Sequence, residues 1–238
     1  MSYALSHFSF SYKTRSFLLF FLLFLVDSIL REFVGEQVHK YVLSLYILGF
    51  FFYYRFGLGQ GNALLNAALV FQFVGIFLAT YVTKNVWFFS IMMIVLNLNI
   101  VLFSFMLYKC AKIKKVSLYL IGFLLTLPYG IVMNFKISDY YGALFWGIQL
   151  RMVVLALLVS VSVVQLIKFP SVKGSLALIG AVLIFTNNIF SGYNLFYFGE
   201  AYFKYAITLT YLLGYFFILT FFIEHYDIKK EDVLYKKN

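Results

Sequence analysis

Long, uninterrupted apolar runs dominate the pattern of hydrophobic and polar positions along this 238-residue chain. Most of the runs are long enough for a helix to cross the hydrocarbon core of a bilayer. They lack the short alternating segments that are typical of membrane β-barrels. The pattern therefore predicts an all-α, polytopic transmembrane helix bundle with about eight spans. The predicted spans are Phe17–Leu30, Tyr41–Leu58, Asn62–Val82, Val86–Tyr108, Val116–Phe135, Tyr141–Ile167, Ser175–Phe198 and Phe203–Ile223.

The short connections between the runs predict antiparallel neighbours in a single domain. We expect a cytoplasmic N-terminal tail (1–15), one transmembrane helical domain (16–225) and a basic cytoplasmic C-terminal tail (226–238). The first run is the shortest, because Arg31 ends its apolar core unless the helix continues. For Asp27, near the end of that run, the favoured interpretation is a side chain that reaches the lipid headgroups, and the alternative is a site at membrane depth.

The composition excludes a soluble domain, because 63% of the residues are hydrophobic, 12% are charged and the mean hydropathy is +0.92. The net charge of +10 is spread over the loops, so contact with anionic lipids explains it better than nucleic-acid binding, which we do not expect. On the side of both termini we predict Lys13, Arg15, Arg55, Lys109, Lys112, Lys114, Lys115, Lys168, Lys173, Lys229, Lys230, Lys236 and Lys237. On the opposite side we predict Arg31, Lys40, Lys84, Lys136 and Lys204. This bias predicts cytoplasmic termini. For the location we expect a multi-pass protein of the bacterial inner membrane.

A polar stripe interrupts the seventh run, in GAVLIFTNNIFSGYNLF at Gly180–Phe196. Asn187, Ser191 and Asn194 fall at i, i+4 and i+7, so they share one face of a helix, and Asn188 lies at the edge of that face. Amides are costly in hydrocarbon unless they find partners. We therefore expect this stripe to face protein or a water-filled cavity, and we expect the pocket of the protein there.

Arg151 lies about ten residues into the sixth run. One interpretation is an intramembrane cation that pairs with a substrate phosphate. The other is an arginine that snorkels, or that pairs with helix-end carbonyls, because the true span begins nearer Leu150. The sequence leaves both interpretations open.

Motifs in three runs share their spacing with a known family. In the seventh run, Gly180, Ala181, Leu183 and Phe196 match the spacing of GALLFxxSDxxLAxxxF. ITLTYLLGYFFI follows in the eighth run, and FQFVGIFLA (Phe71–Ala79) stands in the third run, near the family's FSLLGDxLL. These motifs resemble the lysoplasmalogenase (YhhN) family of eight-helix membrane proteins. Family members with known activity hydrolyse the vinyl ether bond of lysoplasmalogens.

The resemblance also shows where this chain departs from the family. Ile76 replaces the acid of the third helix, and Asn187-Asn188 replaces the Ser-Asp of the seventh. Asn97 stands at the family's His position, with Asn99 as an alternative alignment. Vinyl ether hydrolysis needs groups that exchange protons. Because Asn cannot exchange a proton at usable pH and Ile has no polar group, the resemblance implies a catalytically degenerate relative.

The remaining polar residues at membrane depth predict an interior without ionisable pairs that binds a lipid or a hydrophobic small molecule. The candidate ligand-binding residues are Gln72, Asn97, Asn187, Asn188, Ser191, Asn194, Tyr211 and Arg151. The alternative role for these amides is hydrogen bonding between helices. We expect contacts with membrane lipids and no cofactor.

Other sources of chemistry are sparse in the sequence. His7 lies in the tail, His39 in a predicted loop and His225 beside Glu224, so none has metal-ligand spacing and we expect no metal site. Two alternative functions stay open. One is an active lysoplasmalogenase-like hydrolase in which Asp27 and other groups have taken over, and the other is a small membrane transporter.

Overall fold

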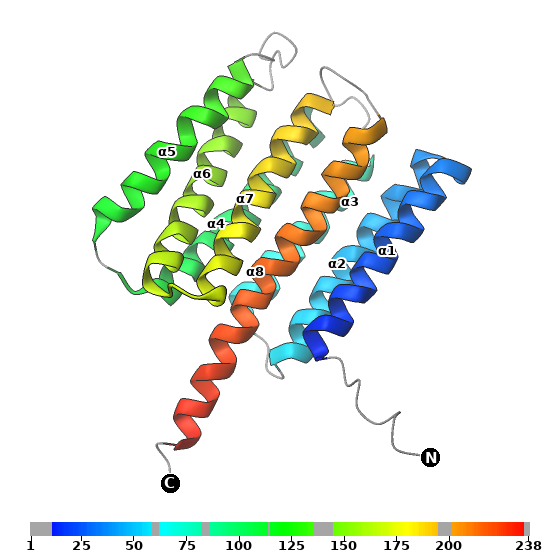
Figure 1. Ribbon diagram of the computed structural model, residues 1–238. Coiled ribbons are helices and arrows are strands. Elements are labelled where there is room, and N and C mark those ends of the chain that lie inside the picture. The colour runs from blue at the N-terminus through cyan, green and yellow to red at the C-terminus, as the bar shows by residue number, and fades with distance from the viewer. Residues whose placement is uncertain are drawn as a thin grey trace, which may run out of the picture.

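The computed structural model describes residues 11–58, 62–81, 86–113, 115–135, 145–194 and 201–235. All regular structure in these ranges is helical, as the sequence predicts (Figure 1). The helices are α1 (Tyr12–Val34), α2 (Glu36–Leu58), α3 (Ala63–Tyr81), α4 (Val86–Ala111), α5 (Val116–Phe135), α6 (Phe145–Lys168), α7 (Val172–Tyr193) and α8 (Ala201–Tyr235).

Four helices are long and apolar enough to cross a membrane within the described ranges. These segments are Trp87–Ala111, Phe145–Lys168, Val172–Tyr193 and Phe203–Tyr226, which belong to α4, α6, α7 and α8. Two shorter apolar segments, Ala63–Ala79 and Val116–Val132, belong to α3 and α5. The bundle is thus compatible with an integral membrane protein.

The first and last helices are longer than their apolar runs. α1 continues past Arg31 to Val34, and the chain turns directly into α2 through Gly35, whose φ of 102° suits a residue without a side chain. α8 continues through most of the predicted C-terminal tail and projects past the other helices (Figure 1). The start of α1 and the end of α8 lie at the same end of the bundle (Figure 1).

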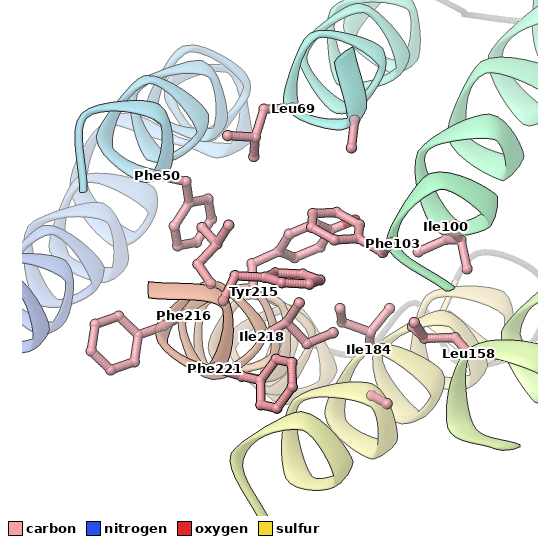
Figure 2. Packing of buried hydrophobic residues seen from close by; sticks show 14 of the residues in the cluster. Phe50, Leu69, Ile100, Phe103, Leu158, Ile184, Tyr215, Phe216, Ile218 and Phe221 are labelled. Atoms are coloured by element: carbon pink, nitrogen blue, oxygen red, sulfur yellow. The ribbon is translucent and has the colours of Figure 1, made fainter. Parts of the chain in front are cut away.

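The side chains of α8 form the centre of the buried core (Figure 2). Tyr215 lies between Phe50 of α2 and Phe103 of α4, with ring centroids 5.8 Å from each. On another side of α8, Ile218 meets Ile184 of α7 (Figure 2). α2, α4 and α7 therefore pack around α8, which also contributes side chains to the candidate site.

Candidate ligand-binding cavity

A cavity of about 310 Å³ lies among α2, α3, α4, α6, α7 and α8. It occupies the half of the bundle where α3 ends and α4 begins, because Ala79 and Phe89 both line it. Most of its lining is apolar, with Met92, Met93 and Ile148 among the residues that form its wall. Its volume is near the lower end of the range for small-molecule pockets, about 300–1,000 Å³.

Arg151 is buried at the wall of this cavity, with only 6% of the residue exposed. Its Nε donates to Asn188 Oδ1 at 3.0 Å, and its Nη1 donates to Leu96 O at 2.6 Å and Asn97 Oδ1 at 3.2 Å. The guanidinium thus joins α6 to α4 and α7 within the bundle. Since Leu96 and Asn188 lie inside their helices, the interpretation of Arg151 as a snorkelling or helix-end residue is wrong.

The positions that the family resemblance singled out lie close together. Ile76 and Asn188 line the same cavity, on α3 and α7. Asn97 does not line it, but its amide oxygen accepts from the arginine that also binds Asn188. Asn99, the alternative to Asn97, is fully buried elsewhere in the core and donates to the carbonyl of Ala68 at 2.7 Å.

The polar stripe of α7 faces the protein interior over most of its length. Asn187, Asn188 and Ser191 line the cavity. The amide nitrogen of Asn187 donates to Ile207 O at 2.6 Å, and the hydroxyl of Ser191 donates to Asn187 O at 2.8 Å. Asn194 is the exception, because it caps the end of α7 and does not line the cavity. The stripe therefore has both of its expected roles, binding a neighbouring helix and lining a pocket.

Two tyrosines of α8 and Gln72 of α3 form a hydrogen-bonded floor to the cavity. The hydroxyl of Tyr215 lies 2.7 Å from Gln72 Oε1 and 2.8 Å from Asn99 Oδ1, and its single proton serves one of these acceptors at a time. Gln72 Nε2 donates to the hydroxyl of Tyr211 at 3.2 Å. The hydroxyl oxygen of Tyr211 is thus an acceptor, and its own proton remains available to a ligand.

Asp27, Arg31 and His39 form an ionisable cluster beside the cavity, which the sequence did not predict. Asp27 is 1% exposed, and its Oδ2 lies 2.8 Å from His39 Nδ1 and 3.3 Å from Arg31 Nη2. Arg31 Nη2 also donates to Thr208 Oγ1 at 2.7 Å. His39 and Thr208 both line the cavity. The prediction of an interior without ionisable pairs is therefore wrong.

The predicted positions of Asp27 and His39 are also wrong. Asp27 does not reach the headgroups, because it points inward to α2, and His39 belongs to helix α2 instead of a loop. The sequence carried one signal for the pairing, namely the i, i+4 spacing of Asp27 and Arg31 within a predicted span. The described residues contain no group of three or more His, Cys, Asp or Glu side chains suited to a metal ion.

The fold and the cavity together define the class: a helical bundle compatible with an integral membrane protein, with a mostly apolar interior pocket that has several polar groups in its wall. No protein-family model, curated protein or solved structure matches the chain. The likeness to the YhhN family therefore rests on the sequence motifs alone.

Proposed function

We propose that this chain is a YhhN-like, eight-span membrane protein that holds a lipid or a hydrophobic small molecule in its cavity and lacks the acid–base pair of the family. The observation that carries this proposal is the lining of the cavity by Ile76 and Asn188, at the positions where the family has acids. Neither side chain can transfer a proton at usable pH. The pocket remains, together with amides that can orient a ligand.

The proposal of eight crossings is supported by the lengths and outer faces of the remaining helices. α1 and α2 have 23 residues each, so each is about 35 Å long, against a hydrocarbon core of about 30 Å. α1 exposes Leu18, Leu22 and Ile29 at its surface and turns Asp27 and Arg31 inward. This distribution suits a helix that faces lipid and keeps its charges paired within the protein.

An even number of crossings places both termini on one side, which the distribution of Lys and Arg identifies as the cytoplasm. We expect green fluorescent protein to fluoresce, and alkaline phosphatase to be inactive, when either is fused to residue 1 or residue 238 in a bacterial host. The measurement is whole-cell fluorescence and phosphatase activity. Phosphatase activity at one terminus only would contradict the even number of crossings.

Ligand binding is tested by extracting small molecules that co-purify with the full chain in mild detergent and identifying them by mass spectrometry. We expect a lipid-like molecule in near-stoichiometric amount. Ser191→Phe should remove it, because Ser191 lines the cavity and a phenyl ring would occupy part of its volume. Val182→Phe is the matched control, because Val182 lies on the same helix and is 44% exposed at its outer face.

Both variants are compared with the wild type by size-exclusion chromatography and thermal unfolding, so that misfolding is recognised. Equal amounts of bound molecule in wild type and a folded Ser191→Phe variant would contradict binding in this cavity.

A second function, a lysoplasmalogenase-like hydrolase, is favoured by the pairing of His39 and Asp27. A carboxylate that binds Nδ1 of a histidine orients the ring and leaves Nε2 for proton transfer, and His39 lines the cavity. The assay is lysoplasmalogen turnover by the wild type, His39→Gln and Asn188→Asp. The proposed function predicts no turnover by the wild type. Robust wild-type turnover that His39→Gln abolishes would establish the hydrolase instead.

A further inference from the structure

We propose that Arg151 makes the cavity an anion-binding site, whose ligand is a single-chain amphiphile with a phosphate or carboxylate head. This inference rests on the proposed function, since it requires an occupied cavity, and it adds the chemical class of the occupant. Three observations carry it: the unbalanced charge of Arg151, the unused donors beside the cavity, and the apolar wall next to them.

The charge of Arg151 is not balanced by any carboxylate among the described residues. Their ion pairs join Lys13 to Glu224, and both Arg31 and His39 to Asp27. The partners of Arg151 are instead three neutral oxygens, on Leu96, Asn97 and Asn188. Arginine does not lose its proton in proteins, and a buried charge is costly without a counter-charge. An anionic ligand would supply that counter-charge.

Arg31 provides the comparison within the same chain. It is buried to a similar extent, with 7% exposed, and it has Asp27 one helical turn away. The bundle thus neutralises one of its two buried arginines with its own acid. Arg151, which also lines the cavity, has only amide and carbonyl oxygens around it in the described part of the protein.

Donors remain for such a ligand at two places. Arg151 uses Nε and Nη1 for its three hydrogen bonds, and in the described ranges its Nη2 group has no hydrogen-bond partner. The hydroxyl of Tyr211 accepts from Gln72 and keeps its own proton to donate. Both residues line the cavity and are more than nine-tenths buried. Charge-assisted hydrogen bonds of this kind are about twice as strong as neutral ones.

The rest of the cavity suits one apolar chain. Phe89, Met92 and Met93 of α4 and Ile148 of α6 line it, and all four lie nearer to the helix ends than the arginine contacts on the same helices. A volume of about 310 Å³ accommodates a small head with part of one chain, and it is too small for a complete two-chain phospholipid. The occupant is therefore amphipathic, with its anionic group at the deeper end.

The test measures binding of three probes with the same sixteen-carbon chain to the full protein in nanodiscs of neutral lipid. The probes are lysophosphatidic acid, palmitate and 1-palmitoylglycerol, which carry a phosphate, a carboxylate and a neutral head. We expect at least one anionic probe to bind about tenfold to a hundredfold more tightly than the neutral probe. Which anion binds identifies the head group as phosphate or carboxylate.

Two variants assign the preference to Arg151. Arg151→Gln should remove it, so that the anionic probes bind this variant no more tightly than 1-palmitoylglycerol does. Asn188→Asp should also remove it, because the new carboxylate would lie beside Nε and neutralise the charge without removing the arginine. This second variant keeps the test informative if Arg151→Gln does not fold. Gln149→Glu is the matched control, because it adds an acid to α6 at a position that does not line the cavity and does not face Arg151 along the helix.

The outcomes separate the inference from the function on which it rests. If none of the three probes binds, the proposed function fails. If all three bind equally, or if the preference survives in folded Arg151→Gln or Asn188→Asp, the anion site is refuted while ligand binding in the cavity stands. Loss of the preference in Gln149→Glu as well would show that added charge anywhere in the bundle suffices, and would also overturn the assignment to Arg151.

Discussion

Replacing Asp27 with alanine is expected to destabilise the protein by about 3–5 kcal/mol, because it leaves a buried arginine without its counter-charge. Asp27 is 1% exposed and holds both Arg31 and His39. Arg31 already has one buried nitrogen, Nε, without a hydrogen-bond partner. After the substitution its guanidinium would keep a hydrogen bond to Thr208 and the ring of Tyr205 at 5.9 Å, and neither carries a charge to balance it. The measurement is thermal unfolding of the purified protein in detergent.

Two controls separate the buried pair from ion pairs in general. Glu224→Ala removes the Lys13–Glu224 pair, whose side chains are 39% and 26% exposed, so it should cost less than about 1 kcal/mol. The double variant Asp27→Ala with Arg31→Leu removes both charges and should recover most of the stability that the single variant loses. An Asp27→Ala variant as stable as Glu224→Ala would show that the pair contributes nothing to the fold.

Gly180→Val is expected to prevent the close packing of α7 and α8 and to cost about 3 kcal/mol or more. A Cβ at Gly180 would lie 2.8 Å from Gly214 O and 3.0 Å from Ile218 N, and both are backbone atoms that cannot move without separating the helices. A side chain at Gly214 of α8 would also approach the backbone of α7, because its Cβ would lie 3.2 Å from Gly180 O. The measurement is the yield of monodisperse protein and its unfolding temperature.

A graded pair of variants tests whether close approach is the cause. Gly180→Ala should lower the unfolding temperature. Gly147→Ala on α6 should leave it unchanged or raise it, because a Cβ there meets nothing within 4 Å and alanine favours a helix over glycine by about 1 kcal/mol. Equal unfolding temperatures for the two variants would contradict the packing explanation.

Gly180 also shows how far a sequence motif can be interpreted. It is the first residue of the stretch that resembles the YhhN family, and the motif alone does not say why a glycine stands there. The structure supplies a physical reason, because the backbones of α7 and α8 approach too closely for a side chain. Small residues at helix contacts are typical of membrane bundles, where close backbone packing contributes to association.

The extent of α1 was predictable only in part. Hydropathy places its core at Phe17–Leu30, whereas the helix runs from Tyr12 to Val34. A hydropathy average takes no account of the partner of a charged side chain, so it counts Arg31 as strongly polar and ends the span before it. In the folded protein that charge lies beside Asp27, one turn earlier on the same helix, and inside the bundle.

The candidate site, too, could be predicted from the sequence only in part. The stripe of Asn187, Asn188 and Ser191 follows from helical spacing, and the structure places all three at the cavity. The partner of Asn188, however, is 37 residues away on α6, and no spacing within α7 indicates it. The sequence also misplaces His39. A polar segment between two apolar runs suggests a loop, but the structure continues helix α2 through this segment.

The sequence by itself therefore determined the helical class, the approximate positions of the helices and the polar face of α7, because each depends on residues within a few turns of one another. Tertiary structure alone decided which charged side chains are buried and which groups from other helices meet them. The cost of a buried charge depends on the groups that other helices bring to it: Asp27 finds His39 on α2, while Arg151 finds only neutral oxygens on α4 and α7 among the described residues. Arg31 thus has Asp27 as its counter-charge, whereas Arg151 has no carboxylate partner among the described residues. This difference between the two buried arginines is the physical basis for proposing that the cavity binds an anion.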